Sequence, residues 1–195
     1  MKRAFDLSVS LAGLCLLWPL LAIIGFAVRL TSGGPILFIQ ERAGRGGRPF
    51  RLLKFRTMLV LSGAESGLFE PGSRSRVTPF GRILRAYKID ELPQLWNVLK
   101  GEMSFVGPRP EIRKWVEAFP SRWTKILSVK PGITDPASVV YRHEEEILAA
   151  SSDPDGTYRS EVLPHKLALY EDYVESRTFW GDVRIILLTL AKIVA

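Results

Sequence analysis

The longest uncharged segment of this chain lies between Asp6 and Arg29 and reads Leu7-Ser-Val-Ser-Leu-Ala-Gly-Leu-Cys-Leu-Leu-Trp-Pro-Leu-Leu-Ala-Ile-Ile-Gly-Phe-Ala-Val28. A straight helix needs about 20 predominantly apolar residues to cross the hydrocarbon core of a bilayer. The segment is therefore long enough to enter a membrane.

A secretory signal peptide is the first alternative, because Lys2 and Arg3 resemble its basic start. However, no small-x-small cleavage site follows the apolar residues, and Asp6 is out of place in such a peptide. Leu14 before Cys15 also spoils a lipoprotein-type cleavage site. We expect the segment to be retained as a membrane anchor over residues 1–30, followed by one cytoplasmic catalytic domain over 31–195.

Pro19 lies near the middle of the segment, where it removes a backbone hydrogen bond and favours a kink. Each arm beside it would rise only about 14–18 Å, roughly half of the hydrocarbon core. Lys2, Arg3 and Arg29 flank both ends, and positive charge tends to stay cytoplasmic. These features favour a re-entrant hairpin of two half-helices, although proline also occurs in spanning helices.

The rest of the chain predicts an α+β fold that is mainly helical, with a small β-hairpin and one active site. Strands are expected over 36–40 and 50–55, joined by the Gly-rich turn 43–49, and a surface loop over 59–79. Residues after Gly132 are expected to form a loop, and 151–156 a turn. Helices are expected over 79–87, 92–99, 111–127 with Pro110 at its start, 144–150, 163–175 and 182–193.

Two apolar stripes suit either the protein core or the membrane interface. One consists of Trp115, Val116, Phe119 and Trp123, and the other is the C-terminal segment 179–195. Each is typical of a core face when taken alone. Beside a membrane segment, we expect them to form interfacial amphipathic helices.

Lys and Arg number 27 against 20 Asp and Glu, a net charge of +7, and there is one cysteine with two histidines. This excludes an intrachain disulfide framework and argues against a structural zinc site. Six basic residues and no acidic ones lie between 42 and 56, namely Arg42, Arg45, Arg48, Arg51, Lys54 and Arg56. Such a run suits anionic lipid headgroups or a diphosphate, less so nucleic acid, and it also suits a solvated hairpin.

Asp90-Glu91 precedes Pro93, which is best tolerated in a first helical turn, so the pair is expected at a helix N-terminus. Asp90 is either a simple N-cap or a reactive group. Three cations precede it, Arg82, Arg85 and Lys88, and a carboxylate in this setting is expected to stay ionised. A nucleophile beside a metal ligand or proton carrier fits two adjacent carboxylates that diverge along a helix.

Two further motifs are weaker. Gly107-Pro-Arg-Pro110 presents an Arg fork on a rigid turn, which suits a phosphate. Asp153-Pro-Asp155 resembles the metal-binding D-x-D of nucleotide-sugar glycosyltransferases, but Gly156 and two preceding serines favour a turn.

Four segments in this order resemble the bacterial sugar transferases, which are monotopic phosphoglycosyl transferases. They are Lys54-Phe-Arg-Thr-Met58, Asp90-Glu-Leu-Pro-Gln-Leu-Trp-Asn-Val-Leu-Lys-Gly101, Met103-Ser-Phe-Val-Gly-Pro-Arg-Pro-Glu111 and Lys130-Pro-Gly-Ile-Thr134. The resemblance covers essentially the whole chain and suggests the minimal catalytic form. We expect a protein of this minimal form, without the large N-terminal membrane region of some relatives.

The resemblance implies transfer of a sugar 1-phosphate from a UDP-sugar to undecaprenyl phosphate, with release of UMP, as the first membrane step of glycoconjugate or polysaccharide assembly. It also implies Mg²⁺, a covalent phosphosugar on Asp90 and a ping-pong course at the cytoplasmic face of the bacterial inner membrane. Glu91 would share metal binding or proton transfer with Asp90, and Pro19 would be the membrane kink. Substrate contacts would come from Lys54, Arg56, Arg85, Pro108, Arg109, Pro110 and Arg142.

After Thr134 the sequence departs from the pattern of many members, which weakens the assignment of Arg142 and of the sugar. Two other classes of protein remain to be tested. One is a non-enzymatic basic scaffold on the membrane surface, and the other is a glycosyltransferase that uses Asp153-Pro-Asp155 and releases UDP.

Overall fold

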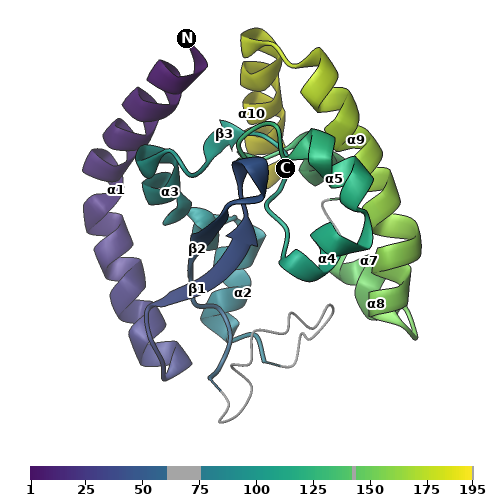
Figure 1. Ribbon diagram of the computed structural model, residues 1–195. Helices are drawn as coiled ribbons and strands as arrows, with labels where there is room; N and C mark the ends of the chain where they lie inside the picture. Colours follow the sequence, from purple (N-terminus) through teal and green to yellow (C-terminus); the bar gives the residue numbers. More distant parts are fainter. Residues whose placement is uncertain (61–75, 142–143, 195) are drawn as a thin grey trace.

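The computed structural model describes residues 1–60, 76–141 and 144–194. Most of the predicted loop 59–79 lies outside these residues, and so does Arg142. Figure 1 shows a mostly helical molecule with α1 (Lys2–Ser32) along one flank, α9 (Leu163–Ser176) along the opposite flank, and a β-hairpin between them. The predicted mainly helical α+β class is confirmed.

Helix α1 runs through Pro19 without a break, and Figure 1 shows it bowed outward about its middle. The predicted hairpin of two half-helices is not confirmed, because the chain bends at this point and does not reverse. The helix is long and apolar enough to cross a membrane, and only 17% of its most apolar window is buried. A core helix of a soluble protein would be mostly buried, so α1 presents its apolar surface outward.

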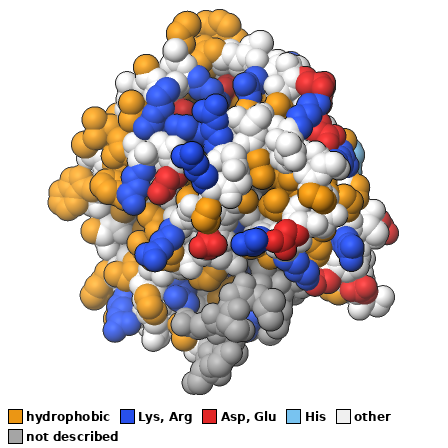
Figure 2. All heavy atoms as spheres, viewed as in Figure 1, with side chains coloured by type: hydrophobic (Ala, Val, Ile, Leu, Met, Phe, Trp, Pro, Cys, Tyr) orange, Lys and Arg blue, Asp and Glu red, His pale blue; other side chains and the backbone are white. Residues whose placement is uncertain are grey.

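The outward face of α1 is mostly apolar, and Figure 2 shows hydrophobic side chains along this edge of the molecule. The exposed residues include Leu16, Trp18, Ile23, Phe26 and Leu30. The inward face buries Asp6 and Ser10 in its first half, and Ile24, Gly25 and Val28 in its second half, which ends at the buried Ser32. A helix with this distribution contacts protein on one side and suits lipid on the other.

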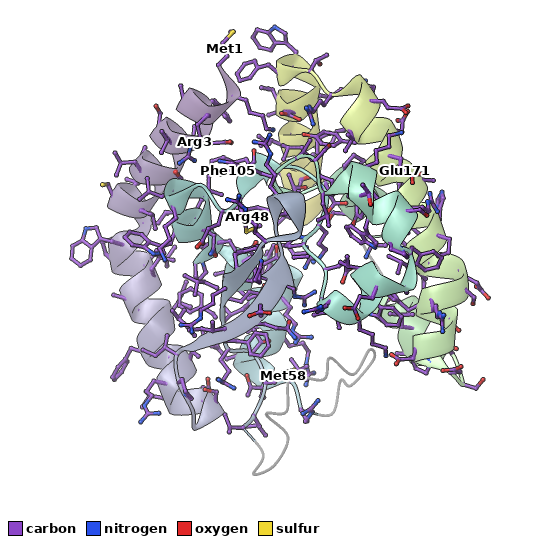
Figure 3. The ribbon with its side chains drawn as sticks, viewed as in Figure 1. Met1, Arg3, Arg48, Met58, Phe105 and Glu171 are labelled. Carbon is purple, nitrogen blue, oxygen red and sulfur yellow. The ribbon has the colours of Figure 1, made fainter. Side chains whose placement is uncertain are left out.

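Polar contacts hold the first turns of α1 against strand β3 (Ser104–Val106). Asp6 accepts hydrogen bonds from the Ser104 hydroxyl at 2.9 Å and from the Phe105 backbone N–H at 3.2 Å. Lys2 donates to the Val106 carbonyl at 2.9 Å and also pairs with Asp182. Figure 3 labels Arg3 on α1, which donates to the Val98 and Leu99 carbonyls at 2.6 and 3.0 Å, and Phe105 on β3.

The far end of α1 packs differently. Ile24 and Val28 join Phe55 and Leu84 in a small buried cluster. Both ends of the helix therefore contact the same folded domain.

Strands β1 (Leu37–Ala43) and β2 (Pro49–Phe55) form the expected antiparallel hairpin, in which Phe38 lies opposite Lys54. The turn between them contains Gly46 and Gly47, both with positive φ, a conformation that glycine adopts without strain. Figure 3 places Arg48 near this turn and Met58 at the other end of the hairpin.

Helices α2 (Pro79–Ala86) and α3 (Gln94–Lys100) confirm the predicted helices 79–87 and 92–99, and Gly101 ends α3 as expected. Between them lies a single 3₁₀ turn, η2 (Ile89–Glu91). Thr78 caps α2 by accepting a hydrogen bond from the Gly81 backbone N–H. The Thr78 cap supplies one of the partners that the first turn of a helix lacks.

The segment after Gly132 is not the loop that the sequence suggested. Strand β4 (Gly132–Thr134) pairs in parallel with β3, and α6 (Pro136–Val140) follows, capped by Asp135. The two strands approach so closely that a Cβ on Gly107 would lie 2.3 Å from the Lys130 carbonyl oxygen. Two of the recognised motifs are thus joined directly.

The expected helix 111–127 is two helices, α4 (Arg113–Ala118) and α5 (Pro120–Ile126). Pro120 has no N–H to continue the ladder of α4, so it begins a new helix. Ile112 is extended, and Pro110 therefore does not start a helix.

The remaining helices are α7 (Glu144–Ala150), α8 (Pro154–Thr157), the π-turn η3 (Tyr158–Val162), α9 and α10 (Phe179–Val194). The expected helices in 144–150, 163–175 and 182–193 are confirmed, and α10 begins earlier because the Thr178 hydroxyl accepts from the Gly181 N–H. The expected turn 151–156 holds the start of α8.

The aromatic stripe on α4 and α5 belongs to the core. Trp115 and Trp123 are buried with Leu163, Leu167 and Tyr170. The α10 stripe is different, because Trp180, Leu187 and Leu190 are exposed there. The interfacial placement of α10 remains a prediction.

Replacing Asp6 by Ala tests whether α1 is a built-in part of the domain. The change leaves the Phe105 N–H without its buried partner, and we expect the free energy of unfolding in detergent to fall by about 1–3 kcal/mol. Ser8→Ala, on the exposed face of α1, is the control and should change stability little. Equal stabilities of the two variants would contradict this docking.

Candidate active site

Lys54 of β2, Asp90 and Glu91 of η2, and Arg109 of the loop after β3 come together between the hairpin and α3. Glu91 is the centre of this group. One of its carboxylate oxygens, Oε1, accepts from Lys54 Nζ at 2.7 Å and from Arg109 Nη2 at 2.8 Å. Three segments distant in sequence are joined at a single atom.

The turn that carries the two acidic residues is fixed by its backbone. Lys88 adopts a left-handed conformation with φ 56°, and the Glu91 N–H donates to the Lys88 carbonyl. Both acidic side chains are buried, with 7% of Asp90 and 6% of Glu91 exposed. The alternative that Asp90 is a simple N-cap of α3 is excluded, since Pro93 occupies that position and α3 has no side-chain cap.

Glu91 is held ionised. Burial by itself would raise the pKa of Glu91, but Arg109 and Lys54 outweigh it and bring this pKa well below its usual range. The same pairing raises the pKa of Arg109. Burial lowers the pKa of Lys54, and Glu91 opposes that effect. Glu91 therefore acts as a fixed negative charge that keeps two cations in place.

Asp90 has the opposite environment. Burial raises its pKa, which Lys54 lowers in part and the neighbouring charge of Glu91 raises further. Its Oδ1 atom is buried and has no hydrogen-bond partner in the part of the chain that the structure describes. The sequence predicts that nearby cations favour the ionised form of Asp90, and Lys54, Lys88 and Arg85 do so, but burial and Glu91 act against them. Asp90 is a desolvated carboxyl group whose charged form is raised in energy.

Arg85 and Arg56 were also predicted to contact the substrate. Arg85 donates from Nε to the Thr57 hydroxyl at 2.9 Å and is close enough to Asp90 to lower its pKa. Arg56 donates to the Pro35 carbonyl at 3.0 Å, near the end of α1. Its role as a substrate contact remains a prediction.

The loop that presents Arg109 is rigid. Pro108 and Pro110 are both buried, and their carbonyls accept from the Gly132 N–H at 3.0 Å and from Arg42 at 3.2 Å. Glu111 then accepts from Arg42 at 3.3 Å and from the Tyr158 hydroxyl at 2.6 Å. The two prolines thus shape the loop, and Arg42 with Glu111 ties it to β1 and η3.

Both carboxylates of the D-x-D alternative make contacts of their own within the protein, although Asp155 Oδ1 is buried without a hydrogen-bond partner among the described residues. Asp153 accepts from the Gly156 N–H at 2.9 Å, and Asp155 pairs with Lys114. The two carboxylates serve the start of α8 and a surface ion pair. The predicted Arg142 lies outside the described residues.

A divalent cation has suitable ligands at Asp90 and Glu91. Among residues 1–60, 76–141 and 144–194, no group of three or more His, Cys, Asp or Glu side chains could hold a metal. Mg²⁺, however, is often bound by one or two carboxylates, with substrate phosphates completing the shell. The unpartnered Oδ1 of Asp90, beside the ionised Glu91, fits a site of that kind.

Sequence reasoning missed three buried polar residues around the group. They are Thr57, which bonds Arg85, Asn97 on α3, and Glu111. All three lie within or directly beside the recognised motifs. Their burial, which is the signal of their role, depends on the tertiary structure.

The comparison with known families agrees with this arrangement. The family model described as bacterial sugar transferase matches residues 1–195, and the chain belongs to this family. Three relatives of the chain carry names that describe transfer of a sugar phosphate to undecaprenyl phosphate.

The chain is 34% identical over 98% of its length to the UDP-N-acetylgalactosamine-undecaprenyl-phosphate N-acetylgalactosaminephosphotransferase of Aeromonas hydrophila, of which it covers 43%. It is 36% identical over 98% of its length to the UDP-glucose:undecaprenyl-phosphate glucose-1-phosphate transferase of Caulobacter vibrioides, covering 69% of it. The Escherichia coli enzyme of the same name is 34% identical, with 40% covered. The chain thus spans less than half the length of two of these relatives.

Asp90→Asn is expected to raise the melting temperature at pH 7. Because the pKa of Asp90 is raised in the folded state, the stability it contributes is full below its unfolded value of 3.8 and is lost as the pH rises through the folded value. Asp90→Asn cannot ionise and so avoids this loss of stability. Its advantage in melting temperature over the wild type should therefore shrink as the pH is lowered toward 4. Thermal unfolding at several pH values measures it.

Asp182→Asn is the matched control. Asp182 is equally buried, but it accepts from Tyr173 at 2.7 Å and pairs with Lys2. This variant should melt at a lower temperature than the wild type. A fall for Asp90→Asn as well would show that the Asp90 carboxylate is stabilised by its surroundings.

Proposed function

We propose that this protein is a phosphoglycosyl transferase that moves a sugar 1-phosphate from a UDP-sugar to undecaprenyl phosphate and releases UMP. The observation that carries the proposal is the contrast between two adjacent buried carboxyl groups. Glu91 is neutralised by Lys54 and Arg109, whereas Asp90 Oδ1 has no partner among the described residues. One carboxylate is structural and electrostatic, and the other is left to react.

In the first step, an Asp90 carboxylate oxygen attacks the phosphorus that bears the sugar. The bond from this phosphorus to the bridging oxygen breaks, UMP leaves with that oxygen, and a sugar phosphate remains on Asp90 as an acyl phosphate. In the second step, a phosphate oxygen of undecaprenyl phosphate attacks the same phosphorus and restores the carboxylate. A covalent intermediate of this kind lets two very different substrates use one site in turn.

The charges around Asp90 suit this chemistry. A carboxylate that attacks a diphosphate must approach a like charge, so the phosphate oxygens need cations in fixed positions. Lys54 and Arg109 are preorganised by Glu91, and Arg85 is oriented by Thr57. Mg²⁺ bound by Asp90 and Glu91 would supply further neutralisation of the diphosphate.

The arrangement of α1 supports a membrane location with the catalytic domain on the cytoplasmic face of the inner membrane. Lys2 and Asp6 at one end of α1, and Ile24 and Val28 at the other, contact the same domain. A helix that crossed the bilayer would place one end on the far side, away from that domain. The bowed helix instead suits re-entrant insertion, with its exposed middle in lipid and both charged ends at one surface.

The nucleotide released identifies the reaction. Purified protein, Mg²⁺, undecaprenyl phosphate and a panel of UDP-sugars should give UMP, and Asp90→Asn should lower kcat by about 10³-fold or more. Asp153→Asn is the matched control and should retain activity. Release of UDP would indicate a glycosyltransferase. If neither UMP nor UDP is released from any donor, the non-enzymatic membrane scaffold is the remaining class.

The position of α1 in the membrane can be measured by cysteine labelling. The chain has one cysteine, Cys15, which is exposed on α1. In the Cys15→Ser background, Ala4→Cys and Thr31→Cys should both react with a membrane-impermeant maleimide from the cytoplasmic side only. Cys15 itself should be protected in membranes and react once the protein is denatured. Labelling of Ala4→Cys from the opposite side would contradict a re-entrant helix.

A further inference from the structure

The side chain of Asn97 connects the two elements that carry Lys54 and Glu91. Asn97 lies in α3 and is buried, with 1% of the residue exposed. Its Oδ1 accepts from the Leu53 backbone N–H at 3.1 Å, and its Nδ2 donates to the Arg51 backbone carbonyl at 2.8 Å. Both partners belong to β2, and Leu53 immediately precedes Lys54.

These contacts are made at the edge of β2 that faces away from β1. In a strand, residues two apart direct their N–H and C=O groups to the same edge, so the Leu53 N–H and the Arg51 C=O are neighbours there. The Asn97 amide offers one acceptor and one donor to this pair, as the peptide group of a third strand would. The outer edge of the hairpin is thereby paired by a side chain.

The orientation of the Asn97 amide is itself fixed. Nδ2 also donates to Glu102 Oε2 at 2.7 Å, an interaction that only the nitrogen side of the amide can make with a carboxylate. In addition, the Asn97 backbone carbonyl accepts from the Gly101 and Glu102 N–H groups at the end of α3. Asn97 is therefore held firmly on α3 before it contacts β2.

A closed chain of contacts results. Glu91 lies one turn before α3, Asn97 joins α3 to β2, and Lys54 on β2 returns to Glu91 at 2.7 Å. If the Asn97 link were lost, the apolar cluster of Phe50, Leu52, Val98 and Met103 would still hold β2 near α3, but apolar packing does not fix the position of the strand along α3 as these two hydrogen bonds do. A displacement of about 1 Å in an active site can cost about 100-fold in rate.

We propose that Asn97 is a positioning residue, whose amide fixes strand β2 against α3 so that Lys54 is held at Glu91 in the reacting site. The functional part of this inference rests on the proposed phosphoglycosyl transfer. Asn97 does not touch the substrate in this scheme and acts through Lys54. Other side chains do not replace it: Asp lacks the two donations of Nδ2 and would face Glu102, and Ala leaves both backbone groups of β2 unpaired.

The first test measures Lys54 directly and needs no enzymatic activity. Competitive acetylation of the folded protein, followed by peptide mass spectrometry, gives the reactivity of each lysine. We expect Asn97→Ala to raise the acetylation rate of Lys54 at least about fivefold, because its ammonium group leaves the ion pair. Lys125, which pairs with Glu175, should be unchanged and serves as the internal reference.

Leu167→Ala is the control for loss of stability. Leu167 is fully buried in the core around α9, remote in the fold from β2, and its truncation should lower the melting temperature without changing Lys54. Asn97→Ser is a milder variant for use if Asn97→Ala does not fold. An unchanged Lys54 reactivity in a folded Asn97 variant overturns the proposal, and so does an equal rise in Leu167→Ala.

The second test is a double-mutant cycle in the nucleotide assay, at a temperature where every variant is folded. We expect Asn97→Ala to lower kcat by about 10- to 100-fold in the wild-type background. In the Lys54→Met background the same change should cost less than about twofold, because the group it positions is already gone. Equal losses in both backgrounds contradict action through Lys54. Where Lys54→Met is too slow to assay, the acetylation result decides, and that result stands even if the proposed transfer is wrong.

Discussion

The carboxylate of Glu91 is the point on which the rest of the site depends. A single oxygen atom of this side chain binds Lys54 from the hairpin and Arg109 from the loop after β3. A buried carboxylate is costly unless it is paired, and these two cations outweigh that cost. Since Glu91 satisfies both cations, the adjacent Asp90 retains an unpartnered oxygen in the same buried environment. The site thus separates a fixed charge from a reactive one between two neighbouring residues.

Local patterns in the sequence predicted much of the fold. The Gly-rich turn at 43–49 indicated the hairpin, and Gly101 marked the end of α3. The features that the sequence did not predict depend on distant contacts. Strands β3 and β4 have three residues each, which is too short to show an alternating pattern of apolar and polar residues. They form because they pair with each other. The sequence predicted a kink at Pro19 but not the docking of α1 on the domain at both ends, which depends on residues far away in the chain. The break at Pro120, by contrast, was visible in the sequence.

Family resemblance singled out Asp90, Glu91, Lys54 and Arg109, and the structure brings these four together. Spacing along the chain did not reveal which carboxyl group would be paired, because that depends on Arg109 arriving from a loop 18 residues away. The raised pKa of Asp90 has the same origin, namely burial that only the folded chain creates. Asn97 and Thr57 lie within the recognised motifs, and their sequence positions predict no particular role for them. Their hydrogen bonds to Leu53 and Arg85 give them a role in holding the cations.

The most direct test of this account is mass spectrometry of the intact protein after incubation with a UDP-sugar and Mg²⁺ in the absence of the lipid acceptor. The account predicts an added mass of one sugar phosphate, located on Asp90 after digestion at low temperature and lost when undecaprenyl phosphate is supplied. Asp90→Asn should show no such mass, while Asp153→Asn should show it in full. An adduct on any other residue, or UMP formed by the wild type only when the acceptor is present and never with an adduct, would contradict the assignment of Asp90 as the nucleophile.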